Sequence, residues 1–273
     1  MRLLRAHHIT ELIAVVDSFL PRELPDPRGG RPVTLHHNEV IALLIFSSLA
    51  APQRTLTGIY NYAQVHFYRR FNLPAYSTWM NKCRGVLPDM LLILDQLLVK
   101  DTSLRSMDST MLEVCKLVRA ERHKVAKGVA GFGYNHQGCH YGFKLHAACN
   151  LKGQLCAIRF TPANESDSQQ IPYLVNDACV IAVGDGGYVA SVMRRKMWRE
   201  HKAYILSPPH PKQRKQVLAR WQLLLLQARP KIECTFDYLK EHLFLATSFP
   251  RSVQGYFVHY VRILLSYQLI WGF

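Results

Sequence analysis

The fold class is decided by the stretch Cys179–Gly187, which reads CVIAVGDGG. Its first five residues are all apolar, and such a run is typical of a strand that is covered on both faces of its sheet. The run stops at Gly184, and Asp185 follows directly, where open α/β sheets place their ligands. The glycines beside Asp185 leave room for a backbone or a phosphate to approach closely. This stretch therefore predicts an α/β fold with a functional carboxylate at the end of a buried strand.

The segments on either side predict a mixed sheet with helices on its faces. Apolar and polar residues alternate over 141–148 and again over 156–160, after a turn at Gly153, which predicts two strands paired as a hairpin. The patterns predict helices at 166–177, 188–202, 212–227 and 230–243, and a further short strand at 203–206. This order of strands and helices is typical of an α/β domain, which we assign to residues 101–273.

Residues 1–100 predict a separate, all-helical domain. Apolar residues recur at three- and four-residue spacing over 8–20, 35–49 and 88–99, whereas the proline- and glycine-rich stretch 21–32 is a linker that no helix could cross. The segment 57–70 interleaves tyrosines, His66 and Phe67 with Arg69 and Arg70, a composition that suits a DNA-contacting helical module. An amphipathic helix whose aromatic residues belong to the core explains the same segment equally well.

Charge and hydropathy limit the classes of partner. Lys and Arg outnumber Asp and Glu by 34 to 19, and the formal net charge of +15 favours a polyanion, with nucleic acid first and an anionic membrane second. No apolar stretch approaches the roughly 18 residues that crossing a bilayer requires. The N-terminus also lacks the apolar run of a signal peptide, so we expect the protein to act in the cytoplasm.

The seven cysteines do not predict a metal or disulfide framework. Their number is odd and no Cys-x-x-Cys pair occurs, which argues against a zinc ribbon and a complete set of disulfides. Cys139, His140 and His146 are close enough in sequence to suggest a zinc site, but no second ligand pair follows, as structural zinc normally requires. Most cysteines are expected to be small buried hydrophobic residues.

Acidic residues are scarce, so their positions are informative. Glu200 is the only acid between Gly186 and Ile232, whereas residues 194–231 contain eleven Lys and Arg. Asp108, Asp185 and Glu233 are the three candidates for a shared site, since carboxylates from two strands and a helix can hold two divalent cations about 4 Å apart. Hard oxygen ligands favour Mg²⁺, with Mn²⁺ as a substitute. Each acid alone could instead cap a helix or satisfy its dipole, and spacing does not establish that the three meet.

Five short strings give the chain a specific resemblance. In order they are MDST at 107–110, YGFKLH at 141–146, TPAN at 161–164, GDGGY at 184–188, and Ile232-Glu233 followed by Phe236, Leu239 and Lys240. Together they resemble the DDE transposases of bacterial insertion sequences, from about residue 104 to residue 245. Arg229, Glu233 and Lys240 also match the Arg-x₃-Glu-x₆-Lys signature around the third carboxylate of that family.

The resemblance implies a fold, a reaction and roles for residues. It implies an RNase H-like catalytic fold, with the catalytic, metal-binding residues Asp108 on the first strand, Asp185 after the fourth and Glu233 on a late helix. The enzyme would cut double-stranded DNA at the terminal inverted repeats and join the 3′-hydroxyl to target DNA, with two Mg²⁺ ions. The N-terminal helical domain would recognise the repeat ends, and a homodimer on DNA is expected, because two ends must be brought together.

The resemblance and the local charge also indicate DNA-contacting residues. Arg229 and Lys240 would contact phosphates near the cut, and Lys144 and His146 would line the cleft. The basic density over 194–231 adds the candidates Arg194, Arg195 and Lys231.

Three positions depart from the family pattern. Gly186 stands where relatives commonly carry Lys, and Leu226 where they often carry Tyr. Arg229 precedes Pro230, which disfavours helical backbone geometry, so we expect Arg229 to lie at a helix start rather than beside Glu233. Two other functions remain open on the sequence: a nuclease of this fold without strand transfer, and a non-catalytic DNA-binding relative.

Overall fold

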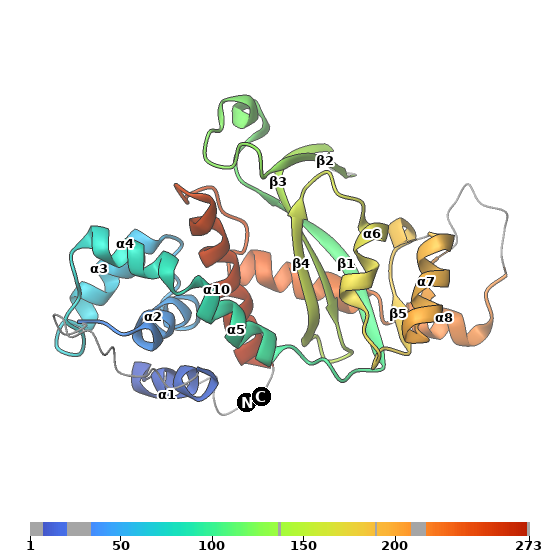
Figure 1. The fold of residues 1–273 in the computed structure, drawn as a ribbon, viewed down its shortest axis with the longest axis horizontal. Coiled ribbons are helices and arrows are strands. Elements are labelled where there is room, and N and C mark those ends of the chain that lie inside the picture. Colours follow the sequence, from blue (N-terminus) through green and yellow to red (C-terminus); the bar gives the residue numbers. More distant parts are fainter. Residues whose placement is uncertain (1–7, 21–33, 136–137, 189, 209–216, 272–273) are drawn as a thin grey trace. The chain divides into compact units, whose positions relative to one another are not determined.

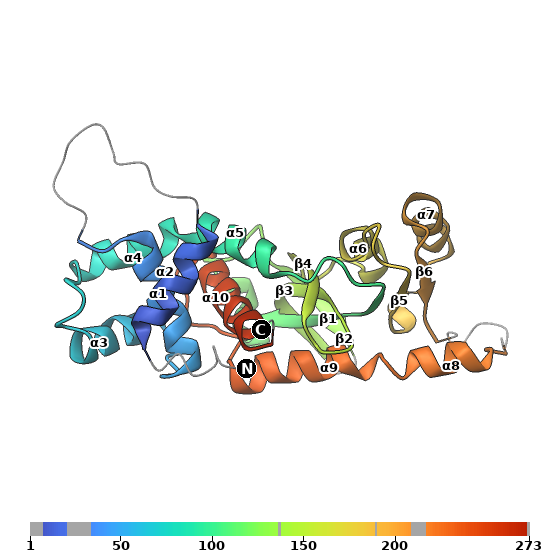
Figure 2. The ribbon, with the colours of Figure 1, turned by 90° about the horizontal axis from the view of Figure 1, so that it is seen from below.

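The computed structural model describes residues 8–20, 34–135, 138–188, 190–208 and 217–271 (Figures 1 and 2). The chain forms two compact units: a helical unit of Met1–Leu97 with Leu243–Phe273, and an α/β unit of Leu98–His242. The first part of the helical unit ends at Leu97, and the unit also includes residues 243–273, which the sequence assigned to the α/β domain. These last residues pack with the N-terminal helices because they carry a long helix whose apolar residues are buried there.

The helical unit is built around two almost fully buried helices, α2 and α10. Arg262 of α10 is buried and donates hydrogen bonds to Ser48 Oγ at 2.7 Å, to the Gln53 carbonyl at 2.9 Å and to His259 Nδ1 at 3.1 Å. A buried charge needs such partners, because leaving it unpaired would be costly. The helices of the unit are α1 Ile9–Phe19, α2 His37–Leu49, α3 Leu56–His66, α4 Tyr76–Gly85, α5 Leu87–Leu97 and α10 Val253–Trp271.

The α/β unit contains one mixed, six-stranded sheet. The strands are β1 Leu104–Glu113, β2 Gly131–Asn135, β3 Gly138–Cys149, β4 Leu155–Pro162, β5 Ile181–Val183 and β6 Tyr204–Leu206. They follow the order β2-β3-β1-β5-β6, and β4 pairs with β3. The pairs that β3 makes are antiparallel, whereas β1 with β5 and β5 with β6 are parallel. The predicted mixed α/β architecture and the β3–β4 hairpin are confirmed.

Helices cover both faces of this sheet. One face packs against α6 and α7 in a core that includes Met107, Ala148, Ile171 and Met197. On the other face lies α9, which contacts β1 and β3, and Figure 2 shows it on the opposite side of the sheet from α6. The helical segments are η2 Leu117–Arg122, α6 Asp167–Leu174, η3 Gly186–Tyr188, α7 Ser191–His201, α8 Arg220–Leu226, α9 Pro230–Asp237 and the π-helical turn Tyr238–His242.

Several predicted elements differ in extent from those observed. Cys179, Ala182 and Val183 of the predicted buried strand are buried, but β5 comprises only Ile181–Val183, and Val180 before it is 55% exposed. The helix expected at 188–202 starts at Ser191, since a 3-10 turn occupies Gly186–Tyr188. The helix expected at 212–227 is observed only as α8, and residues 209–216 lie outside the described residues. Strand β2 was not predicted, because its five residues GFGYN give little pattern.

Two further expectations can be compared with the structure. All seven cysteines are free and five of them are buried, in agreement with the prediction of small buried hydrophobic residues. Among the described residues, no helix combines the length and the apolar character that crossing a membrane would require.

Candidate active site

Asp108 lies in the middle of the central strand β1, on the face that α9 covers. Successive strand side chains point to opposite faces, so Asp108 and Ser109 face opposite sides of the sheet. Ser106, on the same face as Asp108, donates its Oγ hydrogen bond to the Ala228 carbonyl just before α9, at 2.8 Å. The backbone N–H of Ser109 donates to Asp108 Oδ1 at 2.8 Å. Asp108 is thus held, half-buried, between the sheet and the start of α9.

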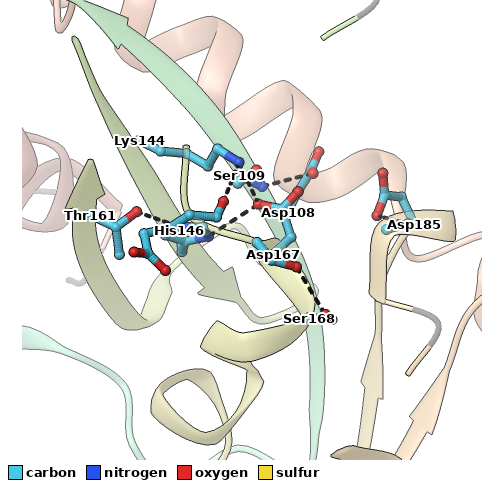
Figure 3. A network of polar contacts seen from close by, with 11 residues as sticks. Asp108, Ser109, Lys144, His146, Thr161, Asp167, Ser168 and Asp185 are labelled. Carbon is cyan, nitrogen blue, oxygen red and sulfur yellow. Dashed lines mark hydrogen bonds and ion pairs between the residues drawn. The ribbon is translucent and has the colours of Figure 1, made fainter. Parts of the chain in front are cut away.

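Asp185 follows β5, the strand that runs parallel to β1. The register pairs Ser106 with Val183, so two further residues along each chain align Asp108 with Asp185. A tight turn begins at this point, because the Gly187 N–H donates to Asp185 Oδ1 at 2.9 Å. Gly184 is required by packing, since a Cβ there would lie 2.8 Å from Cδ2 of the Tyr188 ring. The parallel pairing therefore brings the first two predicted carboxylates to neighbouring positions (Figure 3).

Glu233 lies in the first turn of α9, which packs against β1 and β3. Pro230 occupies the start of the helix, where its missing N–H is not needed. Arg229 adopts helical geometry, with φ −56° and ψ −44°, and its Nη2 is 2.6 Å from Glu233 Oε1. Arg229 is the N-cap residue of α9, so it lies at the helix start as expected. It also lies beside Glu233, which was not expected, because it adopts helical geometry in spite of the following proline.

Asp185 and Glu233 both act electrostatically on Asp108. Burial raises the pKa of Asp108 from 3.8 to about 7, and the charges of Asp185 and Glu233 act in the same direction. The Ser109 N–H and the Arg229 guanidinium oppose this rise. Asp108 thus lies near enough to both other acids for their charges to matter, although the three are far apart in sequence.

Lys240 belongs to the same neighbourhood, because it follows Glu233 by two helical turns. Burial lowers its pKa, while Asp237, Glu113, Glu241 and Asp108 favour its charged form. Its amino group therefore lies within electrostatic reach of Asp108. Arg229 and Lys240, the two cations of the predicted signature, therefore both lie within electrostatic reach of Asp108.

Lys144 and His146 lie on the other face of the sheet. The register pairs His146 with Ser109, which faces away from Asp108. Lys144 lies two residues before His146 on the same strand, so its side chain faces the same way. Both side chains are buried, and both approach Asp167 Oδ1, Lys144 Nζ at 3.2 Å and His146 Nδ1 at 3.4 Å. The expectation that these two residues line the cleft beside Asp108 does not agree with this arrangement, which is drawn in Figure 3.

The remaining basic candidates occupy separate positions. Arg194 lies on α7 and donates to Ser207 Oγ, while Arg195 is exposed on the same helix. Lys231 is partly exposed in the first turn of α9, two residues before Glu233. Of these three, Lys231 is nearest to a predicted carboxylate in sequence, but side chains two residues apart on a helix do not face each other.

Two residues near the carboxylates escaped the sequence reasoning. Asp167 is the partner of Lys144 and His146, and Tyr188 is fully buried with a hydroxyl that finds no hydrogen-bond partner among the described residues. Burial raises the pKa of Tyr188, and the charges of Asp167, Asp108 and Asp185 add to this rise. The available signal was their placement: Asp167 follows the TPAN string, and Tyr188 ends GDGGY.

The donor set suits a hard divalent cation, but the side chains are not drawn together around one position. Asp108, Asp185 and Glu233 offer only carboxylate oxygens, which Mg²⁺ and Mn²⁺ prefer. Within the described part of the chain, no three His, Cys, Asp or Glu side chains lie close enough to hold a metal ion in common. Glu233 is instead paired with Arg229, so shared ligation requires its carboxylate to change partner.

Comparison with known proteins gives one match. The family model described as "Transposase DDE domain" matches residues 99–253, which is more than half of the chain and includes all three carboxylates. A comparison with curated proteins finds no match.

Proposed function

The chain belongs to the transposase DDE domain family, and from this premise we propose that its α/β unit cuts DNA at the ends of an insertion sequence. In this proposal the freed 3′-hydroxyl is then joined to target DNA. Both steps are in-line displacements at phosphorus, in which the protein acts mainly by positioning and by electrostatic stabilisation. The three carboxylates and the cations around them are the residues that would do this work.

The observation that carries the proposal is the effect of burial, Asp185 and Glu233 on the pKa of Asp108. Burial and two neighbouring negative charges raise the pKa of Asp108 to about 7. Two negative charges near a half-buried carboxylate oppose its ionisation, and separate helix-capping roles would not require those charges to lie near Asp108. A bound cation removes the repulsion, so the cluster favours a metal-binding role over three separate helix caps.

Asp108, Asp185 and Glu233 would hold the divalent cations, with Mg²⁺ expected and Mn²⁺ as a substitute. Bound cations of this kind lower the pKa of the attacking water or 3′-hydroxyl and stabilise the leaving oxygen. Asp108 and Asp185 come from adjacent parallel strands, which fixes their relative positions, while Glu233 can adjust through its side-chain rotamer. Arg229 balances the Glu233 charge when no cation is bound, and it is free to contact a phosphate once the pair opens.

An RNase H-like fold is part of the same proposal. The order β4-β3-β1-β5-β6, with β5 and β6 parallel to the central strand, supports it. Asp108 lies on the first strand and Glu233 on a late helix, as the resemblance implies. Asp185 follows β5, which is the fourth strand of the sheet when the short, added strand β2 is set aside.

DNA contact in the α/β unit would come from the cations near the carboxylates. Arg229, Lys231 and Lys240 lie on or beside α9, and Arg194 and Arg195 extend the positive charge onto α7. Phosphate contacts of this kind make binding sensitive to salt, because counterions are released from the DNA. We do not include Lys144 and His146 in this surface, since both are buried against Asp167.

The helical unit would recognise the inverted repeats, and two copies of the chain would bring two element ends together. Recognition by this unit is supported by its basic and aromatic residues around α3 and α4. Dimerisation is supported by the reaction, which needs two ends in one complex.

Carboxylate substitutions test the proposed catalysis. Asp108→Asn, Asp185→Asn and Glu233→Gln should each abolish Mg²⁺-dependent cleavage of a linear duplex that carries the element's own end, while DNA binding persists. Asp237→Asn is the matched control, because Asp237 is exposed and lies one turn after Glu233 on α9. Wild-type cleavage by any of the three variants would remove that residue from the site.

A joining assay distinguishes the alternatives. Pre-cut ends with a free 3′-hydroxyl should be inserted into a second, supercoiled DNA. Cleavage without joining would identify a nuclease of this fold. A protein that neither cleaves nor joins DNA, and that neither Mn²⁺ nor Mg²⁺ stabilises against heat, would be a non-catalytic DNA-binding relative.

A further inference from the structure

The exposed face of α3 has an unusual composition. Thr57, Asn61 and Gln64 are all exposed, and their offsets of four and three residues place them on one face of the helix. The opposite face is buried through Ile59, Tyr60 and Ala63. The solvent face of α3 therefore presents one hydroxyl and two amide side chains in a row.

Lys, Arg, Asp and Glu are absent from α3, whose one basic residue is His66 in the last turn, although the chain carries a net charge of +15. Lys, Arg, Asp and Glu usually occupy the solvent side of a surface helix. In α3 the row of uncharged hydrogen-bonding groups replaces them, and arginines occur just beyond both helix ends. Amide groups between flanking cations are suited to the grooves of DNA, where base edges lie between two phosphate backbones.

The N-terminal end of α3 borders a cavity of about 320 Å³. Two exposed arginines, Arg54 and Arg251, line it together with the first residues of α3. The Arg54 guanidinium lies 3.9 Å from the centre of the Phe244 ring, a stacking contact that orients it. The positive end of the α3 dipole adds to this charge, so the cavity favours an anion such as a phosphate.

The C-terminal end of α3 borders a second cavity, of about 540 Å³. Gln64 lines it with Tyr68, Arg69 and Arg70, and Tyr68 is 63% exposed. None of the described residues that line either cavity is an Asp or a Glu. Each end of the uncharged face therefore has two arginines that no acid of the cavity neutralises.

We propose that α3 lies in the major groove of double-stranded DNA, with Asn61 and Gln64 reading base edges and the two arginine cavities holding phosphates. This inference rests on the proposed function, because it specifies how the helical unit would recognise an inverted repeat. Amide side chains form paired hydrogen bonds with adenine in the major groove. A helix of 11 residues is about 16 Å long, comparable with a groove roughly 12 Å wide. Its ends then approach the two phosphate backbones.

The neighbouring helix α4 is the alternative, and its contacts argue against it. Its exposed Asn81 accepts a hydrogen bond from Arg84 Nη1 at 3.4 Å. Its Lys82 Nζ donates to the Leu35 carbonyl at 2.9 Å. Asn81 and Lys82 of α4 are thus engaged within the protein, whereas Asn61 and Gln64 of α3 face outward. Thr57 of α3 contributes less to the exposed face, because its hydroxyl lies 2.7 Å from the Tyr76 hydroxyl.

The test is selection of binding sites from a pool of duplexes with random sequence, using the full chain in EDTA so that no cleavage occurs. The double variant Asn61→Ala, Gln64→Ala should lose the preference at the base pairs that these residues read, with affinity for the wild-type motif reduced roughly tenfold or more. Arg69→Ala and Arg251→Ala should weaken binding to all sequences, and each should lower the slope of log affinity against log salt by about one. Asn81→Ala is the matched control and should keep the wild-type motif and affinity.

Three outcomes would overturn the inference. The first is a wild-type motif and affinity in the α3 double variant, and the second is a changed motif in Asn81→Ala. The third is a wild-type chain that binds duplex DNA but enriches no motif. All three are independent of catalysis, because the carboxylate variants test cleavage and joining in separate assays. Circular dichroism of each variant verifies that the helical unit is folded.

Discussion

Arg229 and Glu233 form an ion pair across the first turn of α9, with Nη2 and Oε1 2.6 Å apart. The side chains are 34% and 44% exposed, so solvent weakens the attraction. The pair therefore adds little to stability, and its position beside Asp108 indicates a functional role. In this pair, a DNA phosphate could compete with the Glu233 carboxylate for the Arg229 guanidinium.

Arg229→Ala should separate stability from function. We expect a loss of only about 0.3–0.5 kcal/mol in the free energy of unfolding, as for other exposed pairs four residues apart on a helix. Binding to a duplex with the element's end should weaken, with a salt dependence reduced by about one phosphate contact. Arg229→Lys keeps the charge but not the planar guanidinium group. Its affinity for the duplex should therefore lie between those of wild type and Arg229→Ala. Unchanged binding in Arg229→Ala would remove this residue from the DNA surface.

Gly184→Ala should destabilise the α/β unit. The new Cβ would lie 2.8 Å from Cδ2 and 2.9 Å from Cγ of Tyr188, a buried ring that cannot move freely. Overpacking of this kind costs about 1–3 kcal/mol, which urea unfolding would measure. Gly186→Ala is the matched control on the other side of Asp185. A Cβ at Gly186 meets nothing within 4 Å, so its unfolding free energy should stay within about 0.5 kcal/mol of wild type.

Asp167→Ala should also destabilise the α/β unit. It removes the acid that pairs with Lys144, whose side chain is only 9% exposed, and leaves that charge buried. Losing one partner of such a pair costs about 3 kcal/mol or somewhat less, because Asp167 itself is 25% exposed. Asp177→Ala is the control, since Asp177 also pairs with a histidine but is 89% exposed. Equal unfolding free energies for the two variants would contradict the assigned role of Asp167.

The stability of the helical unit should fall in mild acid because of His259. Burial lowers the pKa of His259 from 6.5 to about 3, with Arg262 acting in the same direction. The unfolded chain therefore binds a proton below pH 6.5 that the folded chain does not bind until about pH 3. This contribution to stability is fully present above pH 6.5 and is lost as the pH falls through that window, by up to about 1.4 kcal/mol per pH unit.

Equilibrium urea unfolding between pH 7 and pH 5 would measure this slope. His259→Gln cannot titrate, so its unfolding free energy should depend less on pH than that of wild type, whatever its absolute stability. Identical slopes for the two proteins would show that another group causes the acid sensitivity.

Sequence patterns predicted much of the fold, whereas the three carboxylates were assigned to one site only by the family resemblance. The apolar run before Asp185 and the alternation over 141–148 depend on local physics, and β5 and β3 are found there. The common face of Asp108 and α9 could not be predicted, because a shift of one residue in strand pairing exchanges the two faces. Lys144 and His146 were expected to line the cleft because of the family resemblance, and the register places them on the face opposite Asp108.

The backbone geometry of Arg229 and the limits of the two units could not be predicted from local sequence preferences alone. A preference against helical backbone before proline is a local tendency, and an ion pair within the same turn overrode it. The pairing of residues 243–273 with the first helices left no local signal, since an apolar helix can pack against either unit. Asp167 was missed because its partners lie on a strand about 20 residues earlier.

The α/β unit is inserted between two parts of the helical unit, and this order affects how the protein is made. Helix α10 contributes 14 buried residues to the helical unit, including Tyr256, Tyr260 and Arg262. On the ribosome, the first five helices must wait for about 150 further residues before that last helix emerges, at roughly 5–20 residues per second. All strands of the α/β unit are synthesised before α10. The α/β unit can therefore fold before the helical unit is complete.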